Sequence, residues 1–164
     1  MFEKILIGVD GRAGGRDAVA LATRLAAPSA TLTLAHVEAG LVSRRGHYVA
    51  EERGFDRSAS LLAAERERAG IPAAIVCVGG TSPARGLHAL AREQGADLIV
   101  VGSSRRGFLG RALLGDDARD SLDGAPCAVA IAPHGYAETL APMVEVGIGR
   151  DRATESEHAL AAAR

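Results

Sequence analysis

The sequence alternates short, continuous apolar runs with segments of helical periodicity, and this alternation constrains the fold more than any other feature. Five apolar runs have the length of a strand, and they lie at residues 5–9, 31–37, 73–78, 97–101 and 127–132. A continuous apolar run indicates a strand buried on both faces, as in a parallel sheet covered by helices. Strands that alternate with helices predict right-handed crossovers between neighbouring parallel strands. We therefore expect an α/β fold, a three-layer, doubly wound parallel sheet.

Two helices are predicted before the third strand. Apolar residues recur at helical spacing over 18–25, up to a proline. The pattern is helical again over 55–69, which places Phe55, Leu62 and Ala69 on the inward face.

The third helix has the strongest start signal in the chain. Ser82 supplies a hydroxyl cap and Pro83 suits the first helical position. This helix should end near Gly95, a residue type typical of helix ends. Its buried face should be formed by Leu87, Leu90 and Ala91.

Composition excludes several functional classes. The 164 residues are enough for one domain with a core, and 48% hydrophobic with 24% charged residues fits a soluble protein. A net charge of −1 and only 3% aromatic residues argue against a nucleic-acid surface. No run is long enough to span a membrane, and the N-terminus lacks a signal-peptide pattern. We expect a cytoplasmic protein without nucleic-acid or membrane partners.

The two cysteines, Cys77 and Cys127, lie far apart in separate apolar runs. Their spacing fits no metal motif. We expect two buried, reduced thiols.

The loop after the fourth apolar run is the main candidate for a binding site. The run ends at Gly102, and a loop rich in glycine and arginine leads to an acidic helix start, with a short helix predicted over 116–122. A buried strand that breaks into a glycine loop and enters a helix is typical of anion or nucleotide sites in α/β folds. Ligands in such sheets bind beyond the carboxyl ends of the strands. Asp10, which ends the first run, should lie at the same edge.

Several spaced motifs resemble the universal stress protein family, over about residues 2–133. They are IGVDG at 7–11, LAHV at 34–37, TSPA at 81–84, GADLIVVGS at 95–103 and APCAV at 125–129. The resemblance implies a universal stress protein domain over 1–133, with a five-stranded parallel sheet in the order 3-2-1-4-5. It also implies a stress-response function and a homodimer formed through the fifth strand, residues 127–132.

The resemblance further implies an ATP site, with Mg²⁺ as a companion. ATP-binding members of the family carry Gly-x2-Gly-x9-Gly-Ser/Thr after the fourth strand, and two of these four positions depart here, at Arg105 and Asp116. The family also uses the aspartate after the first strand to hold the nucleoside and the backbone after the second strand to face adenine. The implied cofactor-binding set is Val9, Asp10, Val37, Gly102, Ser103, Arg105, Gly115 and Asp116.

The two departures should weaken the phosphate end of this site. Arg105 adds a side chain where glycine lets the backbone approach phosphate. Asp116 places a carboxylate where a phosphate should lie, and two like charges ~4 Å apart repel by about 4 kcal/mol near a protein surface. The helix N-terminus offers only about 0.3–1 kcal/mol in compensation. Repulsion prevails unless Mg²⁺ bridges the charges or the arginines of the loop, Arg105, Arg106 and Arg111, neutralise them.

Three functions are compatible with these residues. The first is a non-enzymatic stress-response protein in which ATP binding is weakened or lost. The second is an ATP- and Mg²⁺-binding member with slow hydrolysis or phosphotransfer, in which Asp116 is a metal ligand. The third is a dimerisation module in which the fifth strand, 127–132, and the C-terminal tail, 143–164, form the interface. No Walker lysine and no Gly-x-Ser-x-Gly elbow occur in the sequence, so no catalytic residue is assigned.

Two candidate residues also have structural interpretations. Asp10 has an equally good interpretation as a turn residue that caps the first helix. His36 is better explained as a packed strand residue than as a metal ligand.

The C-terminal segment resembles the beginning of a second domain. Residues 134–142 have the composition of a linker. Beyond them, 144–149 and 156–161 align without gaps on 5–10 and 17–22. We expect a partial repeat over 143–164, a strand and a helix that dock on the domain or on a partner chain. An unrelated strand and helix is the alternative.

Overall fold

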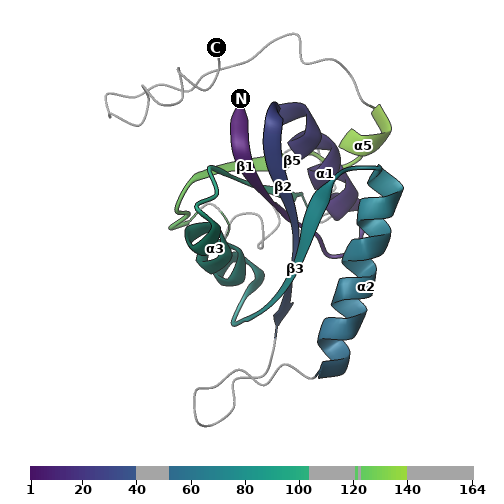
Figure 1. Cartoon of the computed structure of the whole chain (residues 1–164), viewed down its shortest axis with the longest axis vertical. Coiled ribbons are helices and arrows are strands. Elements are labelled where there is room, and N and C mark those ends of the chain that lie inside the picture. Colours follow the sequence, from purple (N-terminus) through teal and green to yellow (C-terminus); the bar gives the residue numbers. More distant parts are fainter. Residues whose placement is uncertain (40–51, 104–120, 122, 140–164) are drawn as a thin grey trace, which may run out of the picture.

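The fold is a five-stranded parallel sheet, as expected. The computed structural model describes residues 1–39, 52–103, 121 and 123–139. The strand order is β3-β2-β1-β4-β5 and every pair is parallel (Figure 1). The strands are β1 (Phe2–Gly8), β2 (Ala26–Ala39), β3 (Ala73–Gly80), β4 (Leu98–Gly102) and β5 (Ala128–Ala132).

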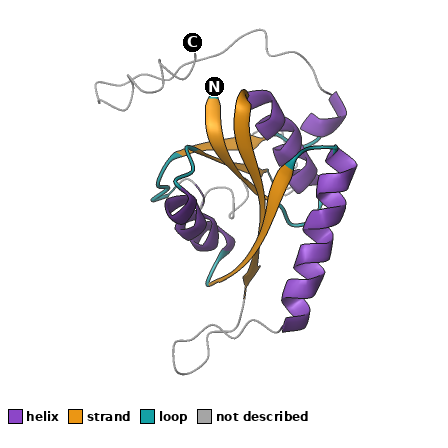
Figure 2. Ribbon diagram, in the orientation of Figure 1, coloured by secondary structure: helices purple, strands orange, loops and turns teal. Residues whose placement is uncertain are grey.

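Helices cover both faces of this sheet (Figures 1 and 2). Helices α1 (Ala13–Leu25) and α2 (Glu52–Ala69) pack on one face, and α3 (Pro83–Gln94) packs on the other. Consecutive strand residues therefore enter different cores: Ile5 and Ile7 join the first, and Leu6 joins the second. All three side chains are at most 2% exposed, which is why the first run could be apolar throughout.

Helix α3 confirms its predicted start, end and buried face. The Ser82 hydroxyl accepts a hydrogen bond from the Arg85 N–H at 3.3 Å, and Pro83 begins the helix. Gly95 ends it in the left-handed conformation, with φ 62°. The three residues predicted to face the core, Leu87, Leu90 and Ala91, are buried.

The second strand begins earlier than predicted. Helix α1 ends at Leu25 and β2 follows at once from Ala26. The register with β1 shifts between the Phe2–Ala26 and Lys4–Thr31 pairs, so the extra residues of β2 form an irregularity. Pro28 lies within it, where proline is tolerated because the regular ladder is interrupted.

Helix α2 shows one incorrect inward residue, Ala69, and two that were missed, Ser58 and Glu65. Leu62 is buried as predicted, but Ala69 is exposed because it is the last residue of the helix. Glu65 is buried instead and lies between two arginines. Its Oε1 is 2.7 Å from Arg68 Nη1 and 3.7 Å from Nη1 of Arg16 on α1. This cluster links the two helices, and a buried carboxylate requires such partners.

A buried aspartate holds the segment after β5 against α1. Asp17 is 2% exposed. Its Oδ2 accepts the Gly135 N–H at 2.9 Å and its Oδ1 accepts the Ala137 N–H at 2.8 Å. These bonds hold the start of the short helix α5 (Tyr136–Thr139), which lies beside α1 in Figure 1. The part of the expected linker that is described, 134–139, therefore packs on the domain.

Two other expectations fall outside the described residues. They are the partial repeat over 143–164 and, except for residue 121, the helix over 116–122.

The cysteines are free, as predicted, but only half-buried. Burial raises the pKa of the Cys77 thiol above its ordinary value of 9.0, and the Glu38 carboxylate raises it further. Burial is also the main cause that raises the pKa of Cys127, Asp97 adds to it, and a hydrogen bond with the Ile99 backbone opposes it.

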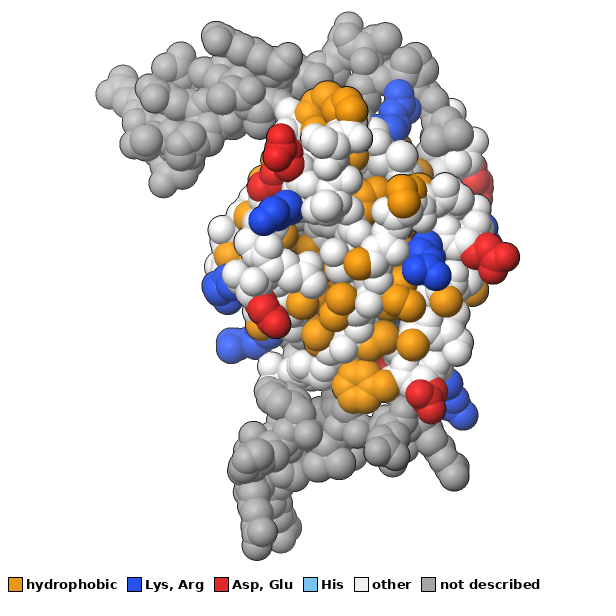
Figure 3. All heavy atoms as spheres, viewed as in Figure 1, with side chains coloured by type: hydrophobic (Ala, Val, Ile, Leu, Met, Phe, Trp, Pro, Cys, Tyr) orange, Lys and Arg blue, Asp and Glu red, His pale blue; other side chains and the backbone are white. Residues whose placement is uncertain are grey.

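On the face shown in Figure 3, acidic and basic side chains of the described residues are interspersed around a central apolar region. Within the described ranges, no helix is both long and apolar enough to cross a membrane.

Candidate functional site

The predicted site residues that are described lie at the carboxyl ends of three strands. Val9 and Asp10 follow β1, and Val37 is near the end of β2. Gly102 is the last residue of β4, and Ser103 follows it. The remaining predicted site residues, Arg105, Gly115 and Asp116, lie outside the described part of the chain.

Asp10 forms a turn between β1 and α1. Its Oδ1 accepts the backbone N–H of Arg12 at 2.9 Å, which is the hydrogen bond of an Asx turn. Its Oδ2 is 3.8 Å from Arg12 Nη1, and half of the carboxylate side chain is exposed. Of its two structural roles, the turn is confirmed, whereas the helix cap is not: the N-cap position of α1 is Arg12.

Glycine is required next to Asp10. Gly11 has φ 75°, a conformation that side chains disfavour. A Cβ at this position would also lie 2.6 Å from Leu61 Cδ1 of α2. The Asp-Gly turn therefore has a packing reason as well as a conformational one.

The first turn of α1 lies between the Asp10 turn and the end of β4. A Cβ on Gly102 would be 2.0 Å from the carbonyl oxygen of Gly14, and a Cβ on Gly14 would be 3.2 Å from the Ser103 oxygen. A Cβ on Gly15 would be 3.4 Å from the Asp10 nitrogen. Two glycines in sequence thus allow the helix backbone to approach both loops. The family motifs include neither glycine, although two adjacent glycines near a helix start are visible in the sequence.

The end of β4 is also tied to β5, because the Ser103 N–H donates to the Ala132 oxygen at 2.9 Å.

The backbone of Val37 points toward the space above β1. The Val9 N–H donates to the Ala35 oxygen at 2.9 Å, so the backbone groups of Ala35 face β1. Alternate residues of a strand direct their backbone groups to the same side, so those of Val37 do as well. The Val37 side chain packs on α3, where a Cβ on Gly86 would lie 2.6 Å from Val37 Cγ1. Gly86 is a further supporting glycine that the motif did not reveal.

His36 connects the ends of β1 and β2. Its Nδ1 is 2.7 Å from the Val9 carbonyl oxygen and its Nε2 is 3.5 Å from Glu38 Oε2. The Ser58 hydroxyl of α2 donates to the same Glu38 oxygen at 2.9 Å. His36 is therefore a packed strand residue, as predicted, with a hydrogen-bonding role at the candidate site that the sequence did not indicate.

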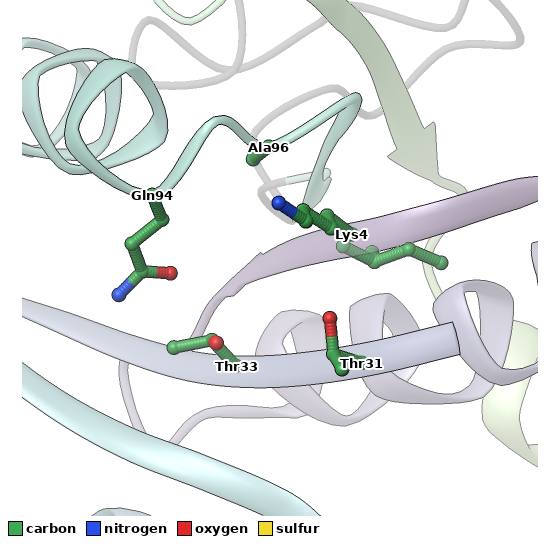
Figure 4. A pocket seen from close by; sticks show the side chains of 6 residues that line it. Lys4, Thr31, Thr33, Gln94 and Ala96 are labelled. Carbon is green, nitrogen blue, oxygen red and sulfur yellow. The ribbon is translucent and has the colours of Figure 1, made fainter. Parts of the chain in front are cut away.

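The opposite end of the sheet carries a small hollow of about 140 Å³. In Figure 4 the labelled polar side chains of Lys4, Thr31, Thr33 and Gln94 surround one space, and the apolar Ala96 lies beside them. The hollow is lined by Lys4, Ile5, Thr31, Thr33, Gln94 and Ala96. Because these residues lie toward the amino ends of the strands, the hollow is separate from the candidate site.

Comparisons with known proteins agree with this architecture. A universal stress protein in complex with cAMP has a TM-score of 0.62 and 25% identity, and the alignment covers 81% of this chain and 98% of that one. A universal stress protein from Archaeoglobus fulgidus has a TM-score of 0.58, 19% identity and coverage of 80% and 99%. An AMP-bound family member from Arabidopsis thaliana has a TM-score of 0.54, 16% identity and coverage of 87% and 97%.

Comparison by sequence gave one match, to a family model. A search of curated protein sequences found no match. The model of the universal stress protein family matches residues 1–133, which include every strand and helix that forms the sheet and its two covering layers. This chain therefore belongs to the universal stress protein family.

Proposed function

We propose that this protein is a non-enzymatic stress-response protein that binds an adenine nucleotide and has weakened affinity for the ATP triphosphate. The observation that carries the proposal is the placement of the Asp10 turn and the end of β4 on the same glycine-rich first turn of α1. The backbone of Val37 faces the same opening. Asp10 would hold the nucleoside sugar, the Val37 backbone would face adenine, and Gly102 with Ser103 would receive the first phosphate.

The nature of the related structures supports a nucleotide ligand. The relative at 25% identity is a complex with cAMP, and two more distant structures contain dAMP and AMP. Each of these nucleotides carries a single phosphate group. A nucleotide with one phosphate would not extend to the Asp116 carboxylate. The further phosphates of ATP would extend to it and be repelled by about 4 kcal/mol, as estimated above.

Calorimetry on the full chain tests this proposal. We expect AMP or cAMP to bind at least tenfold more tightly than ATP with Mg²⁺. The double substitution Arg105→Gly with Asp116→Ser should remove this difference by strengthening ATP binding. The single substitution Asp10→Ala should weaken all three nucleotides equally, and it serves as the matched control for the nucleoside end.

Two results would contradict the proposal. Low-micromolar binding of ATP with Mg²⁺ to the natural chain would favour the alternative in which Asp116 is a metal ligand. Absence of binding for every nucleotide would remove the nucleotide function altogether.

For the partner, we propose a homodimer through β5. This strand is at the edge of the sheet, and its Val129 and Ile131 side chains are only partly buried. An edge strand with apolar side chains is a ready surface for pairing with a second copy. The substitution Val129→Lys should convert a dimer into a monomer in a light-scattering measurement. An unchanged mass would place the interface elsewhere, and a monomeric natural chain would remove it.

A further inference from the structure

We propose that His36 is a positioning residue for the adenine edge of the site and that its charge adjusts the affinity for nucleotide. This inference rests on the proposed function. It arises from the contacts of both imidazole nitrogens, one with the Val9 carbonyl oxygen and the other with the Glu38 carboxylate.

The contacts of the His36 ring determine where its protons lie. A carbonyl oxygen only accepts hydrogen bonds, so the 2.7 Å contact requires the proton on Nδ1 of His36. Nε2 then faces the Glu38 carboxylate at 3.5 Å. A neutral ring would direct a lone pair at that carboxylate, whereas the imidazolium directs an N–H at it. The doubly protonated ring therefore complements both of its neighbours.

The His36 ring also affects the backbone hydrogen bonds between β1 and β2. In a continued parallel ladder, the Val9 carbonyl would accept the N–H of Val37 after the Val9 N–H has donated to Ala35. The His36 ring takes that acceptor at 2.7 Å. The ring thus competes with the Val37 N–H for an oxygen that has two acceptor positions, which favours leaving that N–H to a ligand at the carboxyl edge.

The hydrogen bond from His36 to Val9 also affects Asp10. The Val9 carbonyl and the Asp10 N–H belong to one peptide group, and a hydrogen bond to the carbonyl polarises the whole group. A charged donor forms a stronger bond than a neutral one. Protonation of His36 should therefore increase the polarisation of the Asp10 N–H and stabilise the turn.

The charged and titratable groups around His36 are few within the described ranges. Glu38 lies on the same strand, and from α2 the contact of Glu38 is the uncharged Ser58 hydroxyl. Cys77 is the register partner of His36 on β3, and burial raises its pKa, so it stays a neutral thiol at physiological pH. On the β1 side, the Asp10 carboxylate is turned toward Arg12. Glu38 is thus the charged group with which the protonated His36 ring would interact.

Binding of cAMP at constant ionic strength tests the proposal, because its phosphodiester does not titrate between pH 5.5 and 8. We expect the natural protein to bind about fivefold more tightly at pH 5.5 than at pH 8, as one strengthened hydrogen bond allows. His36→Asn keeps a donor near Nδ1 without charge and should lose the pH dependence. Glu38→Gln should reduce it, and His36→Leu should bind more than tenfold more weakly at both pH values. An unchanged pH profile in His36→Asn would overturn the proposal.

Nuclear magnetic resonance of the nucleotide-free protein separates this inference from the proposed function. The amide resonance of Asp10 should shift with the same midpoint as the His36 ring, and His36→Asn should abolish the shift. If no nucleotide binds at any pH, the function fails, and this titration still decides whether His36 is coupled to the turn. An Asp10 amide that does not follow the ring would overturn the coupling.

Discussion

Substitution of Gly102 by alanine should destabilise the protein even without a ligand. The new Cβ would lie 2.0 Å from the Gly14 oxygen and 2.3 Å from its carbonyl carbon. Because carbon contacts shorter than 3.0 Å essentially do not occur, the first turn of α1 must retreat by about 1 Å. Both obstacles are backbone atoms, so no side-chain rotation relieves them. We expect a loss of about 3 kcal/mol, the upper part of the range for overpacking.

The assay is thermal unfolding of the nucleotide-free protein. For a chain of this size, a loss of about 3 kcal/mol lowers the Tm by about 10 °C. Gly54→Ala is the matched control, since its nearest neighbour is the flexible end of Glu38 at 3.3 Å and alanine favours the interior of α2. If Gly102→Ala melts within about 2 °C of the natural protein but no longer binds nucleotide, then glycine is needed for phosphate approach and our packing argument is refuted.

Three further predictions concern stability. Asp17→Ala should cost about 2–4 kcal/mol, because two N–H groups of the α5 segment lose their acceptor; unchanged urea unfolding and unchanged hydrogen exchange in that segment would contradict this. Ser82→Ala should cost about 1 kcal/mol in urea unfolding, whereas Ser82→Asp should keep the cap, so equal losses in both variants would rule out a capping role. Because the folded pKa values of Cys77 and Cys127 are raised above 9.0, their contribution to stability is complete below pH 9 and is lost as the pH rises through the folded values. Unfolding at pH 8 and pH 10 checks this, and a double Cys→Ser variant should lose less stability over that interval; an identical loss in both proteins would show that the thiols are not responsible.

The candidate site could be predicted only in part. Asp10, Val37 and Gly102 are found by a resemblance of motifs, and the parallel topology explains why they share one edge of the sheet. The residues that hold this site in place, such as Gly14 and His36, could not be identified from motifs. Gly14 was missed because its requirement arises from a strand end that follows it by more than eighty residues. His36 was predicted to pack, but its bond to Val9 depends on the register of two strands.

The sequence by itself determined the number of described strands, their parallel arrangement and the limits of α3. These features depend on local signals: apolar runs too continuous for a half-exposed strand, and a serine, proline and glycine placed at helix ends. The tertiary structure alone decided which polar groups are buried and with which partners. Asp17 accepts hydrogen bonds from residues 118 and 120 positions away, and Glu65 joins arginines on two helices. A buried carboxylate is stable only where the fold brings hydrogen-bond donors to it. Because these donors are far away in the sequence, no local pattern of residues predicts the contact.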